Sequence, residues 1–399
     1  MVFRSNSGSA ANARVTSPAF THPPSPHGRL TTRRLTTRLS LAAAVATAGA
    51  LTLSAGFAGA ASASTSAHHA ATRSTQSGSK RVGIAEPDLI TKSARVQASE
   101  LKSMKALGIT SIRLDADWSG VQYGGPNSFS WAPLDRVVKS VRAAGMSVDL
   151  IIDGCPAWAA AAGTSGDVSP PPASAAQYAA FAADVAARYA PRGVTMFEIW
   201  NEPNNAGFWS PKPSAAAYTA DLKAAYASIK HADPAALVLS AGLAPEVNDG
   251  ININAITFLK SMYADGAKNS FDAVAYHPYS YPALPNSYQS WSGWSQMSQT
   301  NPSIRSVMTS NGDAAKQIWI TEVGAPTSGP DGVGQQGQTD DLTQAIANTN
   351  STTWIAGLYL YSWKDEGTDP ANDENWFGLV TAAGAHKTAY TAVATALGH

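Results

Sequence analysis

Cysteine is nearly absent from this sequence, which has one, Cys155, among 399 residues. No disulfide can form within the chain, so its stability must come from packing. Cys155 has no evident partner histidine, which favours a small buried residue over a catalytic thiol. With 44% hydrophobic residues at this length, the chain is ample for a large core.

Charge is also sparse, because only 14% of the residues are Asp, Glu, Lys or Arg. The first 63 residues contain six arginines but no lysine and no acidic residue. Without those six, 22 basic side chains stand against 28 acidic ones, a net charge of −6. An acidic body argues against binding nucleic acid through its phosphates, so we expect no nucleic-acid partner.

Long apolar runs are missing except near the start of the chain, from Leu39 to Ala60. Arg33-Arg34 precedes this run, and Ala61-Ser62-Ala63 follows it as a cleavage candidate. We expect residues 1–63 to be a signal peptide, with the paired arginines fitting twin-arginine export, and residues 64–80 to be a disordered linker. An uncleaved anchor is the alternative, since the run is long enough to span a bilayer. Its many small residues favour cleavage and secretion, leaving no stable membrane span.

From residue 81 onward, short apolar runs alternate with helical patterns. The runs predict buried strands at Val82–Ala85, Ser111–Asp115, Ser147–Asp153, Thr195–Trp200, Ala236–Ala241, Ala273–His277, Gln317–Thr321 and Gly357–Ser362. Apolar residues one helical turn apart predict helices around 134–141, 178–189 and 218–229. Weaker helical patterns cover about 93–107, 255–265, 302–314, 339–349 and 386–397.

Eight apolar strands, each followed by a helix, predict a closed parallel sheet with its helices outside. We therefore expect one α/β domain over residues 81–399, a single (β/α)8 TIM barrel. A doubly wound open sheet is the alternative. That fold normally carries a phosphate-binding loop after its first strand, and Val82–Ala85 is not followed by one.

Catalytic residues of such a barrel lie at the C-terminal ends of its strands. The fourth predicted strand ends in Asn201-Glu202, and the seventh is followed by Glu322. These two carboxylates would face each other across the barrel mouth, with aromatic residues around them. Paired carboxylates of this kind suit the hydrolysis of glycosidic bonds, in which one protonates the leaving oxygen and the other attacks the anomeric carbon.

The motif FEIWNEPN at residues 197–204, together with IWITEVG at 318–324, resembles the retaining (β/α)8 glycoside hydrolases of clan A. Three details look closest to family 39, which includes xylosidases and exopolysaccharide-cleaving endoglycosidases. They are the Pro-Ala-Trp-Ala turn at 156–159, the segment NNAGFW at 204–209, and FGLV at 377–380. Family 5, with its glucanases and mannanases, is the near alternative. Asp153 ends the third strand, where many family 5 members carry His.

The resemblance implies that Glu202 is the acid/base and Glu322 the nucleophile. It further implies that Asn201 bonds the sugar 2-hydroxyl, and that Arg113, His277 and Tyr279 hold and orient the nucleophile. Trp363 matches the aromatic platform under the sugar at the cleavage point. Trp158 and Trp209 are further substrate-binding candidates.

Each supporting residue also has a structural alternative. Arg113 could form an ion pair inside the barrel, with Glu198 or Asp115 as its partner. Glu198 shares the strand parity of Glu202 but lies deeper, so we interpret it as structural. His277 and Tyr279 could be hydrogen-bonded core residues. The three tryptophans could serve packing, since Trp is often buried.

Our hypothesis is a secreted glycosidase of xylosidase or endoglycanase type, which cleaves β-glycosides or polysaccharides with retention. A non-catalytic or cell-surface-anchored glycan-binding barrel is the alternative. The oxygen-rich run Asp369–Asn375 lacks the ligand spacing of a calcium loop, which favours a solvated loop. We expect no metal or organic cofactor. The sugar, the linkage and the choice of exo or endo cleavage stay open.

Overall fold

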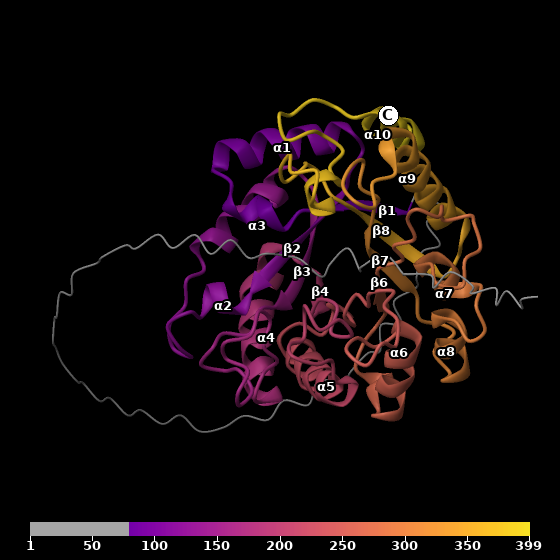
Figure 1. The fold of residues 1–399 in the computed structure, drawn as a ribbon. Helices are drawn as coiled ribbons and strands as arrows, with labels where there is room; N and C mark the ends of the chain where they lie inside the picture. The colour runs from indigo at the N-terminus through magenta and orange to yellow at the C-terminus, as the bar shows by residue number, and fades with distance from the viewer. Residues whose placement is uncertain (1–79) are drawn as a thin grey trace, which may run out of the picture.

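The computed structural model describes residues 80–399, and these form an eight-stranded parallel sheet surrounded by helices (Figure 1). The predicted signal peptide and nearly all of the predicted linker lie outside the described residues. All eight predicted strands are present, with ends that shift by two residues at most. They are β1 (Arg81–Ala85), β2 (Ser111–Asp117), β3 (Ser147–Asp153), β4 (Met196–Ile199), β5 (Leu237–Leu239), β6 (Val274–Tyr276), β7 (Ile318–Val323) and β8 (Ile355–Tyr361).

The sheet closes into a barrel. Hydrogen-bonded neighbours follow the order β5-β4-β3-β2-β1-β8-β7-β6, so every strand except β5 pairs with the next one in the chain and β1 pairs with β8. The remaining gap between β5 and β6 is bridged in parallel at Leu239 with Ala273 and at Leu243 with Tyr276. The (β/α)8 TIM-barrel prediction is therefore confirmed, and the doubly wound alternative is wrong.

The helices pack outside the strands. They are α1 (Ala94–Ala106), α2 (Trp118–Val121), α3 (Ala132–Ala143), α4 (Ala175–Tyr189), α5 (Ala215–Ala232), α6 (Ala255–Ala264), α7 (Gly293–Ser298), α8 (Ile304–Ser310), α9 (Gly334–Ser351) and α10 (Thr388–Leu397). Short 3-10 turns cover Pro87–Thr91, Ala190–Arg192, Ala267–Asn269 and Asp373–Trp376. Serine N-caps begin several of the helices, as Ser174 does for α4 and Ser214 for α5.

Helix α9 starts five residues before its predicted beginning at 339. Its first turn contains only Gly and Gln and is largely exposed, and the first residues that the helix buries, Gln338 and Thr339, are polar. A hydrophobic period cannot detect such a turn. No helix of residues 80–399 is both long and apolar enough to cross a membrane.

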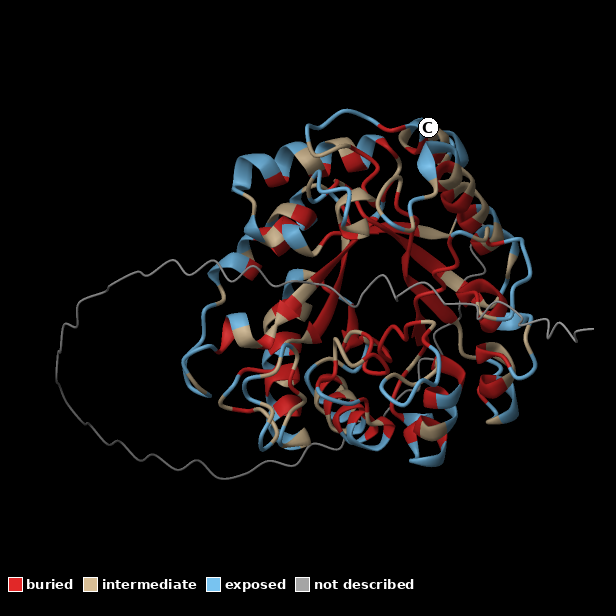
Figure 2. Ribbon diagram, in the orientation of Figure 1, coloured by how far each residue is buried: buried red, intermediate tan, exposed pale blue. Residues whose placement is uncertain are grey.

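Two hydrophobic layers hold the barrel together, and the strands are buried on both faces (Figure 2). The larger layer lies between strands and helices, and includes Val138 of α3 and Phe181 of α4. The smaller layer fills the barrel interior, where Met196 of β4 and Tyr359 of β8 belong. Successive residues of a strand point to opposite faces. Every second residue counted from these interior side chains therefore also points into the barrel, and those near the C-terminal ends of the strands lie at its mouth.

Candidate active site

The turn after β4 is held in an unusual backbone conformation. Trp200 and Glu202 both have positive φ, 70° and 45°, which is rare for residues with bulky side chains. The turn is fixed on both sides, because the indole Nε1 of Trp200 donates to the Phe208 carbonyl at 2.8 Å and the amide of Glu202 donates to the Gly242 carbonyl at 3.0 Å. Local strain of this kind is kept where surrounding contacts enforce it, often at functional sites.

An irregularity in β7 brings two neighbouring side chains to the barrel mouth. Ile320 pairs with Leu358, but the next aligned pair is Val323 with Leu360, so β7 carries one extra residue. In a regular strand Thr321 and Glu322 would point to opposite faces. Here Thr321 contacts His277 and Glu198 while Glu322 contacts Arg113 and Tyr279, so both side chains face the site.

Arg113 of β2 lies at the centre of the site and joins three polar side chains. Its Nε and Nη2 donate to the two carboxylate oxygens of Glu198, at 2.8 and 3.2 Å. Its Nη1 donates to Oε1 of Glu322 at 2.6 Å, and Nη2 also donates to Oδ1 of Asn201 at 3.0 Å. Arg113 thus forms the barrel-interior ion pair with Glu198 and also holds the predicted nucleophile, so the two interpretations are compatible.

Tyr279 completes the contacts of Glu322. Its hydroxyl donates to Oε2 at 2.8 Å, while Arg113 occupies Oε1. Both donors are side chains that keep their protons at neutral pH, and an ionised carboxylate is the acceptor that suits them.

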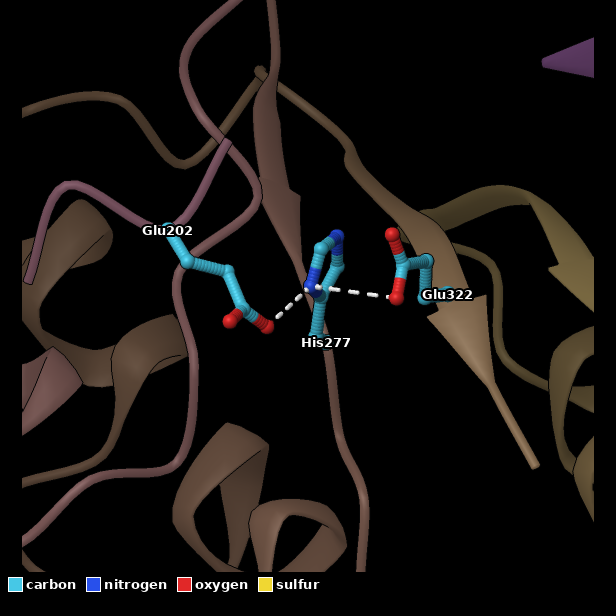
Figure 3. Close-up of side chains that lie close together, drawn as sticks. All are labelled: Glu202, His277 and Glu322. Carbon is cyan, nitrogen blue, oxygen red and sulfur yellow. Dashed lines mark hydrogen bonds and ion pairs between the residues drawn. The ribbon is translucent and has the colours of Figure 1, made fainter. Parts of the chain in front are cut away.

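Glu202 has a different environment. It is completely buried, and its Oε1 lies 2.7 Å from Nδ1 of His277. The same Nδ1 is 3.8 Å from Oε2 of Glu322, so His277 lies between the two carboxylates but closer to Glu202 (Figure 3). Burial, followed by the charge of Glu322, raises the pKa of Glu202 well above its ordinary value. This direction favours a carboxyl group that keeps its proton.

The three predicted tryptophans lie away from this cluster or face other side chains. Trp363 is buried between barrel and helices, with its ring 6.0 Å from that of Tyr390 in α10, so it offers no surface to a sugar. Trp209 is equally buried and packs edge-on against Trp200. Trp158 is half-buried, and its Nε1 donates to the Gln122 carbonyl at 2.8 Å. The platform expected at Trp363 is therefore not supported by the geometry.

Tyr361, which ends β8, faces the barrel interior, and it was not among the residues predicted for the site. It belongs to the interior layer with Tyr279 and Phe377, and its hydroxyl donates to Oε2 of Glu374 at 3.0 Å. The charge of Glu322 is among the influences that raise the pKa of Tyr361, after burial and two other carboxylates, which places the two residues in the same region. Strand β8 ends at Tyr361, so Trp363 lies beyond the alternation that would have aimed it inward.

One group of side chains among residues 80–399 has the spacing of a metal site: one ligand atom each from Glu202, His277 and Glu322 lie within 4.8 Å of one another. Arg113 and Tyr279 already occupy the two oxygens of Glu322, and a guanidinium at 2.6 Å would repel a cation. We therefore assign no metal to this cluster.

A (β/α)8 barrel with a pair of carboxylates after β4 and on β7 defines a glycoside hydrolase of clan A. The family model described as "Cellulase (glycosyl hydrolase family 5)" matches residues 78–366, and the chain belongs to this family. The motifs of the sequence had looked closest to family 39, with family 5 as the alternative. A search of curated proteins found no match.

Solved structures of both families are similar to this chain. A family 39 glycoside hydrolase from Bacteroides cellulosilyticus WH2 aligns with a TM-score of 0.61 at 18% identity, over 80% of this chain and 64% of that one. A GH5_18 enzyme from Streptomyces cattleya, in complex with Manb1-4GlcNAc, gives 0.61 at 17% identity over 80% of each chain. The chain thus spans less than two thirds of the Bacteroides enzyme. At these identities the likeness establishes the fold alone.

Proposed function

We propose that this glycoside hydrolase cleaves β-glycosidic bonds with retention of configuration, using Glu202 as acid/base and Glu322 as nucleophile. The observation that carries the proposal is the spacing of the two carboxylates, since an oxygen of one lies within 4.8 Å of an oxygen of the other. This is the approach of single oxygen atoms, and it fits a retaining enzyme, whose carboxyl groups lie about 5–5.5 Å apart, better than an inverting enzyme, whose carboxyl groups lie about 6.5–9.5 Å apart with a water molecule between them.

In the first step Glu322 attacks the anomeric carbon and its carboxylate becomes a glycosyl ester. Arg113 and Tyr279 orient the two oxygens of Glu322, which leaves the carboxylate little freedom to turn away from the sugar. Glu202 gives its proton to the departing glycosidic oxygen, and the raised pKa of Glu202 keeps that proton available near neutral pH.

In the second step Glu202 takes a proton from water, which attacks the anomeric carbon and releases Glu322. Formation of the ester removes the charge of Glu322, the second cause of the raised pKa of Glu202. The pKa of Glu202 should therefore fall at the point where the reaction requires a base.

Asn201 is a suitable partner for the sugar 2-hydroxyl. Its Oδ1 accepts from Arg113, which leaves the amide Nδ2 as a donor toward a ligand. The names of the similar structures include xylosidases, a glucosidase and an exo-β-1,4-mannosidase, so we propose a β-glycoside or polysaccharide and no single sugar. We also propose that the enzyme acts outside the cell, because of the arginine-led apolar run at residues 39–60.

The experiment that tests the mechanism is proton NMR of the first-formed anomer, recorded during hydrolysis of a panel of aryl β-glycosides and β-linked polysaccharides. Retention predicts the β-anomer as the initial product, which then mutarotates. An initial α-anomer would contradict the proposal, and so would hydrolysis of a polysaccharide by Glu322→Gln at the wild-type rate.

A further inference from the structure

A chain of hydrogen bonds leads from the ion pair inside the barrel to Glu202. Oγ1 of Thr321 lies 3.1 Å from Oε1 of Glu198 and 3.0 Å from Nε2 of His277. The other ring nitrogen of His277, Nδ1, lies 2.7 Å from Glu202. Thr321, Glu198, His277 and Glu202 are all completely buried, so water cannot replace any of these contacts at low cost.

The direction of the bond between Thr321 and Glu198 follows from the other partners of Glu198. Its Oε1 accepts from the Gly242 amide at 2.9 Å and from Nη2 of Arg113, while its Oε2 accepts from Nε of Arg113. Burial raises the pKa of Glu198, but Arg113 opposes this effect. An N–H group can only donate, so Glu198 fits its surroundings as an ionised acceptor. The Thr321 hydroxyl must therefore donate to Glu198.

A hydroxyl that has given its proton to Glu198 can only accept from His277. The proton on the imidazole ring must then be on Nε2. In the neutral ring Nδ1 is consequently a lone pair directed at Glu202, and it can accept the carboxylic proton of Glu202 but cannot donate to its carboxylate.

We propose that Thr321 is a positioning residue, which fixes the Nε2-protonated tautomer of His277 and thereby keeps Glu202 in the protonated form needed for the first catalytic step. The inference rests on the proposed function, because it concerns the acid/base role of Glu202. Thr321 directly precedes the proposed nucleophile, and the irregularity of β7 brings both side chains to the site.

Several charged or titratable groups surround His277. Glu202 follows β4 and Glu198 lies within it, Glu322 belongs to β7, and Tyr279 follows β6 with its ring 6.3 Å from the imidazole. Arg113 of β2 contacts two of these carboxylates, Glu198 and Glu322. The charge of Glu322 favours the positively charged imidazolium of His277 over the neutral imidazole. The hydroxyl of Thr321 determines which ring nitrogen carries the proton when the imidazole is neutral.

The first test reads the proton directly. Nitrogen-15 NMR of the histidine-labelled enzyme separates protonated from unprotonated ring nitrogens, and the His277→Asn variant assigns the signals among the eight histidines. We expect Nε2 to stay protonated across the pH range while Nδ1 titrates. A neutral ring with its proton on Nδ1 would overturn the proposal. This measurement needs no activity, so it remains decisive even if the proposed reaction is wrong.

The second test compares Thr321→Val, which removes the hydroxyl, with Thr321→Ser, which keeps it. In Thr321→Val the ring can place its proton on Nδ1 and donate to the Glu202 carboxylate, which lowers the pKa of Glu202. The basic limb of kcat/KM for alkyl β-glycosides should then move to lower pH by about 1 unit. Activated dinitrophenyl glycosides, which need little acid assistance, should keep their wild-type profile.

The outcomes separate the proposal from a packing role and from failure of the proposed function. Thr321→Ser should retain the wild-type pH profile. Equal losses on both substrate types in both variants, or an unshifted basic limb in Thr321→Val, would refute a positioning role. If Thr321→Val does not fold, Thr321→Ala gives the same comparison with a smaller side chain. A wild-type enzyme inactive on every β-glycoside would refute the proposed function, while the nitrogen-15 signals would still test the tautomer.

Discussion

Glu322 and Glu202 are the same amino acid at the same barrel mouth, yet their surroundings differ in almost every respect. Glu322 is slightly exposed, and its two oxygens accept from a guanidinium and a phenol. Glu202 has no exposed surface, and its Oε1 meets an imidazole, which can accept as well as donate. The first environment favours an anion, and the second favours a group that exchanges a proton.

In the proposed mechanism, each role is therefore set by neighbours from other strands and not by the glutamate itself. Glu322 depends on β2 and on the loop after β6, through Arg113 and Tyr279. Glu202 depends on the loops after β5 and β6, through Gly242 and His277. The barrel brings these segments together because all its strand ends meet at one edge. Substitutions on either side should therefore produce different kinetic signatures.

The largest effect is expected for Glu322→Gln. An amide cannot form the glycosyl ester, so hydrolysis should fall on the order of 10⁴-fold or more for every substrate, whatever its leaving group. Initial rates on one alkyl and one dinitrophenyl β-glycoside measure this loss. A selective loss on the alkyl substrate would show that Glu322 is not the nucleophile.

Glu202→Gln should have the opposite selectivity. Loss of the general acid should lower kcat/KM for alkyl glycosides by about 10²–10⁴-fold and leave formation of the intermediate from dinitrophenyl glycosides nearly intact. Because the pKa of Glu202 is raised, the wild-type enzyme should lose activity on alkyl substrates only as pH rises above the ordinary range of a glutamate. A basic limb that survives in Glu202→Gln would assign the acid to another residue.

The fold was predictable because its signals are local. Each strand contains a short apolar run that the sequence shows directly, and most helices have a clear period, as α3 has with four buried residues from Leu134 to Val141. Helix α9 was partly missed because its first turn contains only Gly and Gln, and the first residues that it buries, Gln338 and Thr339, are polar. Buried polar residues carry no hydrophobic period, so only their three-dimensional partners show that they are inside.

The sequence indicated only those site candidates that lie near a strand end or in a motif. Glu202, Asn201, Arg113 and Tyr279 are of this kind, and the structure brings them close together. The sequence could not show that Tyr361 faces the barrel interior while Trp363 packs outside it, because this depends on where β8 stops. The extra residue of β7 could not be predicted either, because no residue type or pattern in the sequence indicates where one strand has an additional residue relative to its neighbour.

A smaller but selective effect is expected for Gly242→Ala. A β-carbon at this position would lie 2.1 Å from Nε2 of His277 and 2.7 Å from Oγ1 of Thr321, so both side chains would have to move and the contact of His277 with Glu202 would be disturbed. We expect kcat/KM for alkyl glycosides to fall about 10²-fold, with a much smaller loss on dinitrophenyl glycosides. Gly166→Ala is the matched control, because its β-carbon would meet no atom within 4 Å. Equal losses on both substrates would mean that the glycine protects the whole site and not the acid side.

The smallest effect concerns the nucleophile side. Tyr279→Phe removes one hydrogen bond to a charged group. At the lower end of the usual range such a bond is worth about 1.5 kcal/mol, so kcat/KM should fall about 10-fold on alkyl and dinitrophenyl glycosides alike. Tyr281→Phe is a close control. Its ring packs against Tyr279 with centroids 6.2 Å apart, and its buried hydroxyl bonds to no described residue. If both variants lose the same activity, the effect comes from aromatic packing. The hydrogen bond from Tyr279 would then not be what keeps Glu322 an oriented anion, and the proposed contrast with Glu202 would not hold for Glu322.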